Sequence, residues 1–276
     1  MRAARAWLVA ATAGVVACGG EVRQTAATGE RLPTLQDVSE AQWAALAHER
    51  VFFGHQSVGR NIMEGVAEVL AANPRIGLRV VESKDVAGAP GFYHALVGRN
   101  EHPVEKVDEL VRVADSAFVA DSGVAMVKFC YVDVQPNTDV GALFDGYRQR
   151  MDALRVRHPG LTIVHFTMPL TASENWKGVL MNRLRRQESQ RDRNVVRSRY
   201  NALLLAHYQG KEPVFDIARL ESTRPDGARL FFERGADSVF TMVPEYTDDG
   251  GHLNAASRRM VAEQLLIFLA RLGPSR

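Results

Sequence analysis

The chain has 276 residues, of which 34 are Lys or Arg and 32 are Asp or Glu, so its formal net charge is only +2. A charge this close to balance gives no general basic surface for nucleic acid and no acidic surface for a basic partner. We therefore expect no nucleic-acid partner.

The first seventeen residues have the composition of an export signal. Arg2 and Arg5 give a positive start, an apolar run covers 7–16, and Val15-Val16-Ala17-Cys18 resembles the lipobox of bacterial lipoproteins. The apolar run is too short to span a bilayer permanently, which favours a cleaved signal. We expect a lipoprotein signal peptide at 1–17, a lipid on Cys18, and a location in the bacterial cell envelope, with the lipid as the membrane attachment. The alternative is a buried N-terminal helix that contains a cysteine.

The next segment predicts a tether and then a globular domain. Lipidation of Cys18 leaves Cys130 without a partner, so no disulfide is expected, and Cys130 is interpreted as a small buried hydrophobic residue. Residues 18–40 contain few large apolar side chains, which predicts a flexible tether. Residues 41–276, about 235 in number, suit one α/β domain with a sizeable core.

Apolar runs alternate with helical patterns along this domain. The expected strands are 51–53, 78–81, 124–134, 161–166 and 212–216, and the expected helices are 58–70, 105–113, 143–156, 182–208 and 255–272. This alternation predicts an α/β fold with three layers and a doubly wound, mostly parallel sheet of the flavodoxin type. Ligands bind beyond the carboxyl ends of the strands in such folds.

Two distant segments carry residues suited to hydrolysis. Ser57 follows the first strand at a turn into a helix, and Asp249 precedes His252 by three residues in a glycine-rich loop before the last helix. A carboxylate can hold one imidazole nitrogen while the other nitrogen removes the proton of a serine hydroxyl. We therefore predict a triad of Ser57, His252 and Asp249, with Asp248 as an alternative carboxylate.

Simpler interpretations of these residues stay open. Ser57 could only cap the helix that follows, although that position also places its hydroxyl beside free backbone amides. The segment around Asp249 and His252 could be a polar surface loop in which Asn254 caps the last helix.

The strand, Ser57 and helix near the start, and Asp249-x-x-His252 before the final helix, resemble the SGNH (GDSL-type) hydrolase family over residues 51–272. The nucleophile block of the family reads Gly-Asp-Ser, where this chain has Gly54-His55-Gln56-Ser57, whereas Asp-x-x-His is matched in full. The resemblance implies that Ser57 attacks an acyl carbon, that His252 acts as general base and then acid, and that Asp249 orients the imidazole. We expect no cofactor.

The resemblance also implies an oxyanion hole with three donors. They are the amide of the nucleophile, a glycine after the second strand and an asparagine after the third. The third turn reads Cys130-Tyr131-Val132-Asp133, so the asparagine is absent. We predict that Gly98 and Asn100 supply donors beside the Ser57 amide, although Asn100 as a turn former is equally open. Asp133 is interpreted as a turn or structural residue.

Three further features have less specific interpretations. His55 could contact substrate, or join Asp248, Asp249 and His252 around a metal, but no tight ligand pattern accompanies it and a metal-free site is expected. His165 is interpreted as a core residue. A set of arginines on one expected helix is interpreted as a solvated face rather than a phosphate or acidic-polysaccharide site; it comprises Arg183, Arg185, Arg186, Arg191, Arg193, Arg197 and Arg199.

The sequence as a whole predicts a serine esterase that acts on a small-molecule or polysaccharide ester, with an acyl group on cell-envelope carbohydrate as the favoured substrate. The alternative is a non-catalytic envelope lipoprotein that binds carbohydrate and retains the hydrolase fold. The prediction of this substrate rests on the expected cellular location and on family analogy.

Overall fold

The computed structural model describes residues 21–86, 88–118, 122–174, 184 and 189–273. Its main sheet has six strands in the order β3-β4-β2-β5-β6-β7, and each neighbouring pair is parallel. The strands are β2 (Arg50–His55), β3 (Val80–Glu82), β4 (Gly91–Leu96), β5 (Gly123–Val127), β6 (Leu161–Phe166) and β7 (Val214–Phe215). From β2 the chain passes to the edge strand β3 and returns to β4 beside β2, and it then crosses to β5, β6 and β7 on the other side of β2. The predicted doubly wound parallel sheet is therefore confirmed.

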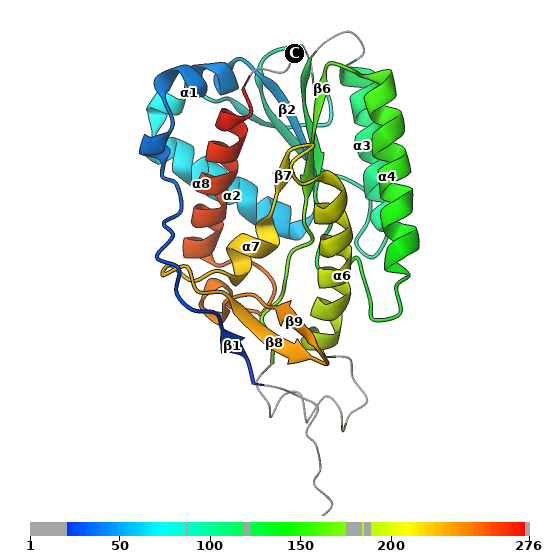
Figure 1. Cartoon of the computed structure of the whole chain (residues 1–276). Helices are drawn as coiled ribbons and strands as arrows, with labels where there is room; N and C mark the ends of the chain where they lie inside the picture. Colours follow the sequence, from blue (N-terminus) through cyan, green and yellow to red (C-terminus); the bar gives the residue numbers. More distant parts are fainter. Residues whose placement is uncertain (1–20, 87, 119–121, 175–183, 185–188, 274–276) are drawn as a thin grey trace, which may run out of the picture.

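Helices cover both faces of this sheet and complete three layers (Figure 1). One face carries α1 (Glu40–Ala47), α2 (Ser57–Ala72), α7 (Ile217–Ser222) and α8 (Ala255–Arg271); the other carries α3 (Pro103–Ala117), α4 (Val140–Arg157) and α6 (Gln190–Tyr208). Successive residues of β2 point to opposite faces, so Val51 and Phe53 join one hydrophobic core while Phe52 joins the other.

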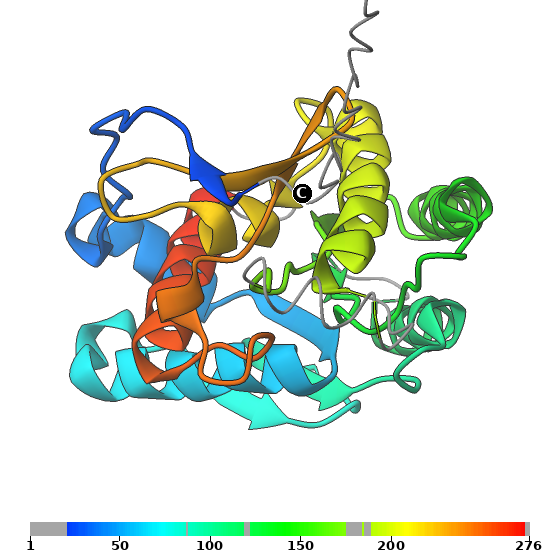
Figure 2. The ribbon, with the colours of Figure 1, turned by 90° about the horizontal axis from the view of Figure 1, so that it is seen from below.

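A second, antiparallel sheet lies beside the carboxyl ends of the parallel strands (Figures 1 and 2). It contains β1 (Arg23–Gln24), β8 (Leu230–Arg234) and β9 (Asp237–Phe240) in the order β1-β8-β9. The sequence patterns predicted none of these strands, nor β4 in the main sheet. The third predicted strand also ends earlier than expected, at Val127, because the chain then enters the turn in which the Cys130 amide donates to Asp133.

The predicted tether over 18–40 is wrong for residues 21–40. Arg23 and Gln24 pair with β8, and the amide of Arg229 donates to the Thr25 hydroxyl at 2.9 Å. Leu35 and Val38 are buried in the main core, beside a short 3-10 helix, η1 (Leu35–Asp37). Backbone pairing with a distant strand therefore fixes a segment whose own composition is too polar to predict order. The predicted signal peptide and Cys18 lie outside the described residues.

The interpretation of the arginine-rich helix as a wholly solvated face is also wrong. In α6 the side chain of Arg197 is completely buried and Arg191 is 5% exposed. Arg197 donates to the carbonyl of Tyr131 and to the side chains of Thr171 and Asn194, which offset the cost of burying its charge. Of the other arginines in this set, Arg183, Arg185 and Arg186 lie outside the described residues.

Candidate active site

Ser57 is the first helical residue of α2, at the carboxyl end of the central strand β2. The turn between them is tight: a Cβ atom added to Gly59 would lie 2.2 Å from Cβ of His55, so only glycine permits this approach. The Gln56 side chain donates to the carbonyls of Val97 and Gly98, both at 2.9 Å, and ties the turn to the end of β4. Ser57 is therefore held, half-buried, at the switch point of the sheet.

The loop before α8 brings an imidazole to this hydroxyl. His252 Nε2 lies 3.0 Å from Ser57 Oγ, and His252 Nδ1 lies 2.6 Å from Asp249 Oδ2. Asp249 Oδ1 accepts from the amides of Gly251 at 2.9 Å and His252 at 2.8 Å, so the carboxylate also shapes the loop that carries the histidine. The structure therefore brings together the three residues predicted as a triad, and the carboxylate on His252 is Asp249 rather than Asp248.

The contacts assign the protons of this set. A carboxylate can only accept, so Nδ1 of His252 carries the hydrogen and Nε2 is left as the acceptor for the Ser57 hydroxyl. Burial acts to raise the pKa of the Asp249 carboxyl, but the backbone amides of His252 and Gly251 and the imidazole outweigh it and lower that pKa well below its usual range. Asp249 thus stays ionised and able to stabilise an imidazolium.

The turn after β5 forms one wall of the site. Cys130 is buried with Sγ 3.7 Å from Ser57 Oγ, so this predicted core residue also contacts the candidate nucleophile. The ring of Tyr131 packs edge-on against His252, with 5.5 Å between ring centroids. Arg197 Nε, from α6, donates to the Tyr131 carbonyl at 3.0 Å and so helps to fix the turn. The sequence places the turn that carries Tyr131 at this edge of the sheet, but the contacts of Tyr131 with His252 and of Arg197 with Tyr131 could not be predicted, because only the fold makes them.

Glycine at position 251 is required by this wall. A Cβ atom there would lie 2.7 Å from Cζ of the Tyr131 ring, closer than real Cβ contacts. We expect Gly251→Ala to displace either Tyr131 or the loop and to lower kcat for the hydrolysis that the sequence predicts at least about tenfold, because small errors in the position of a base are costly. Steady-state kinetics would check this. Gly250→Ala is the comparison variant. A Cβ atom at position 250 meets no neighbour, but the backbone φ there is +90°, so this substitution should strain the backbone rather than displace Tyr131.

The contacts of the other predicted oxyanion donors do not support their role. The Gly98 amide donates to Glu109 Oε2 at 2.6 Å, so that hydrogen is already used. Asn100 is exposed, and its Oδ1 accepts from the buried Lys106. Lys106 is in turn paired with Asp133, which agrees with a structural role for Asp133. The amides in the first turn of α2, which have no carbonyl partner inside the helix, are the donors that the fold does place beside Ser57 Oγ.

His55 is buried and pairs with the half-buried His94 rather than with the His252 loop. Its Nδ1 lies 3.0 Å from the Gln56 carbonyl, which can only accept, so its Nε2 accepts a hydrogen from His94 Nδ1, also 3.0 Å away. Burial, together with the nearby His94, Lys128 and Arg60, lowers the pKa of His55 to about 3, although the Gln56 carbonyl opposes this. Among the described residues, no group of three His, Cys, Asp or Glu side chains is placed to hold a metal ion.

This pair predicts acid sensitivity of the fold. Between the ordinary histidine pKa of about 6.5 and about 3, the unfolded chain binds a proton at position 55 that the folded chain excludes. Stability is therefore lost as pH falls through this window, by up to about 1.4 kcal/mol per pH unit. Other buried groups titrate in the same window, with the raised pKa of Glu221 acting in the opposite direction, so the His55 contribution is read from the difference between variant and wild type. We expect the wild type to lose more melting temperature than His55→Gln between about pH 7 and about pH 5.

The control for this measurement is His48→Gln, since His48 is exposed at the end of α1 and should leave the wild-type slope unchanged. The lowered pKa of Asp249 also reduces stability in acid, but only at pH values below about 4, the ordinary pKa of an aspartate. A pH dependence of melting that is the same in His55→Gln and wild type would contradict the assignment.

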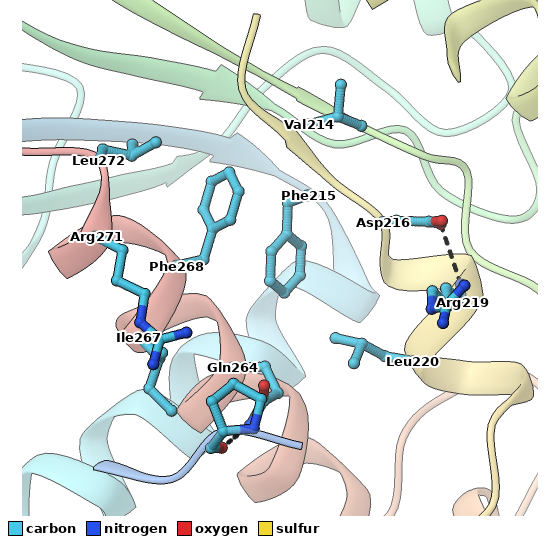
Figure 3. Close-up of a pocket in the computed structure, with 11 residues that line it drawn as sticks. Val214, Phe215, Asp216, Arg219, Leu220, Gln264, Ile267, Phe268, Arg271 and Leu272 are labelled. Atoms are coloured by element: carbon cyan, nitrogen blue, oxygen red, sulfur yellow. Dashed lines mark hydrogen bonds between the residues drawn. The ribbon is translucent and has the colours of Figure 1, made fainter. Parts of the chain in front are cut away.

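A mostly apolar cavity lies apart from Ser57. It has a volume of about 380 Å³ and lies between α7, β7 and α8, where Phe215, Leu220 and Phe268 face one another (Figure 3). Its lining includes none of the triad residues.

Within the described part of the chain, no helix has both the length and the apolar composition needed to cross a bilayer.

No protein-family model matches this chain, and no curated protein matches it significantly. Among solved structures, a Bacteroides fragilis protein proposed to be an acylhydrolase has a TM-score of 0.50 and 14% identity, over 84% of this chain and 94% of that one. A carbohydrate esterase family 3 protein from Talaromyces cellulolyticus has a TM-score of 0.45 and 13% identity, over 81% and 97% of the two chains. The first similarity shows a shared fold, and identities this low transfer no activity.

Proposed function

We propose that this protein is a serine esterase or acyl hydrolase in which Ser57 attacks the acyl carbon. The observation that carries this proposal is the chain of contacts from Asp249 through His252 to Ser57, at 2.6 and 3.0 Å, at the carboxyl end of the central strand. The shared fold with a protein proposed to be an acylhydrolase agrees with it.

The reaction follows from these contacts. His252 Nε2 takes the Ser57 proton as the hydroxyl attacks the ester carbonyl, and Asp249 stabilises the imidazolium that forms. The first-turn amides of α2 offset the charge on the carbonyl oxygen. The imidazolium then gives its proton to the leaving alcohol, and water repeats the sequence to release the acid from the acyl-serine.

The substrate and the cellular location are proposed on fewer observations than the activity. We propose an ester on cell-envelope or other extracellular carbohydrate as the substrate, supported by the lipid that the sequence leads us to expect on Cys18. Mass spectrometry of the membrane fraction tests the proposed location. A diacylglyceryl group on an N-terminal Cys18 supports it, and an unprocessed N-terminus in that fraction contradicts it.

Labelling with a fluorophosphonate probe tests the activity, because only an activated serine forms the covalent phosphonyl adduct. We expect one adduct, at Ser57, and hydrolysis of p-nitrophenyl acetate that a chelator does not change. An unlabelled, folded protein would instead support the non-catalytic alternative, in which the fold binds carbohydrate without turnover. Loss of activity with chelator and its return with a divalent ion would contradict the metal-free mechanism.

A further inference from the structure

A second cavity, of about 660 Å³, lies where the N-terminal segment crosses α7 and the loop that follows it. One side is formed by residues 25–32 and the other by 219–229, with Phe240, Tyr246 and Met260 completing the wall. Its volume is within the range of small-molecule sites, and its lining contains neither Ser57 nor Asp249 nor His252. We call it the N-terminal cavity.

The charged side chains of the N-terminal cavity are unbalanced. Four arginines line it (Arg31, Arg219, Arg224 and Arg229), and Glu30 is the single acidic residue among its lining. Guanidinium groups present a planar set of donors that matches a carboxylate, whereas the apolar wall at Leu220, Phe240 and Met260 suits the body of an organic molecule.

Arg229 is the arginine of this cavity whose hydrogen-bond donors are least satisfied by the protein. Its guanidinium lies over the ring of Phe240, 3.4 Å from the centroid, and donates from Nε and Nη2 to a single acceptor, the Ser222 hydroxyl, at 3.2 and 2.9 Å. Within the described part of the chain, no carboxylate lies within ion-pair distance of it. The group is half-buried, and its hydrogen bonds go to a neutral hydroxyl, while the nearest stabilising carboxylate, Asp216, acts only from beyond ion-pair distance.

The neighbouring arginines are paired in a way that a ligand can replace. Arg219 contacts Glu30 at 3.3 Å and Arg224 contacts Glu245 at 3.3 Å, and both glutamates are more than 60% exposed. Exposed pairs of this kind contribute little stability. Nε of Arg224 is buried without a hydrogen-bond partner. Glu30 therefore occupies the position that an incoming carboxylate would take at Arg219.

From these contacts we propose that the N-terminal cavity is a binding site for an organic carboxylate, held by Arg229 and Arg224 with its apolar or sugar body against Phe240 and Met260. The site is separate from the triad and does not depend on the proposed esterase activity. The same chemistry is offered by a sugar acid and by a medium-chain fatty acid, and the experiment distinguishes these two sources.

The experiment is isothermal titration calorimetry of the full chain with glucuronate, with octanoate and with sulfate. Sulfate is included as an anion that has no organic group to contact the apolar wall. We expect saturable binding of one equivalent of glucuronate or octanoate, weakened at least about tenfold in Arg229→Met, which removes charged hydrogen bonds. Arg99→Met is the matched control, because Arg99 is an exposed arginine paired with Glu105 away from the cavity.

Glu30→Gln guards against a folding artefact, since a misfolded variant would not gain affinity. This change removes the competing carboxylate from Arg219 and should tighten binding of the same ligand. The proposal is overturned if neither organic acid binds, if Arg229→Met binds as well as wild type while its melting curve is normal, or if sulfate binds as tightly as the organic acids. Because binding is measured without an ester, these results do not depend on hydrolysis.

Discussion

Ser57→Ala should reduce the hydrolysis of p-nitrophenyl acetate by about 10⁴-fold or more, the loss typical when the nucleophile of a triad is removed. No other hydroxyl is placed by the described contacts at 3.0 Å from His252 Nε2, so the imidazole would have no proton to take. Steady-state kinetics and probe labelling measure the loss.

The fold should survive this change. Gln56 rather than Ser57 is the N-cap residue of α2, and the contacts of the Ser57 hydroxyl are with His252 and Cys130 at the surface of the site. Circular dichroism and thermal melting should therefore match the wild type. Ser116→Ala, on the exposed side of α3, is the control and should keep full turnover. A folded Ser57→Ala variant with near-wild-type turnover would show that Ser57 is not the nucleophile.

Asp249→Asn should lower kcat by about 10⁴-fold, as the equivalent change does in serine proteases. An asparagine can present its NH₂ group to Nδ1, which favours the tautomer with hydrogen on Nε2, and that nitrogen can no longer accept the Ser57 proton. The stopped-flow or steady-state rate of a p-nitrophenyl ester would record the effect on kcat with little change in KM.

Asp248→Asn is the matched control because it makes the same chemical change one residue earlier. Asp248 is exposed, and both contacts of a carboxylate with His252 come from Asp249. We expect its kcat to stay near the wild-type value. Wild-type activity in Asp249→Asn with a loss in Asp248→Asn would reverse the assignment, and wild-type activity in both variants would indicate a dyad of Ser57 and His252 alone.

Features with a local physical cause could be predicted from the sequence. The period of apolar residues gave β6 at 161–166 and placed α4 and α8 within a few residues of their bounds, because helices and buried strands carry their own repeat. The spacing between Asp249 and His252 is also local, since a carboxylate three residues before a histidine reaches its Nδ1 within one loop.

Features that depend on a distant partner could not be predicted in this way. β1 is ordered by pairing with β8, about two hundred residues away, and nothing in its own composition indicates this. The amide of Gly98 is occupied by Glu109 from α3, so the family pattern after the second strand does not carry over. His55 pairs with His94 because β2 and β4 are neighbours in the sheet.

By itself, the sequence determined the α/β class and the two segments that carry Ser57, Asp249 and His252, because short-range periodicity and the chemistry of neighbouring side chains are written within each segment. Only the tertiary structure decided that these segments meet, that Tyr131 and Arg197 support His252, and that the N-terminal segment encloses a cavity lined by arginines. Strand order and burial set these contacts, and both depend on pairings between residues far apart in the chain.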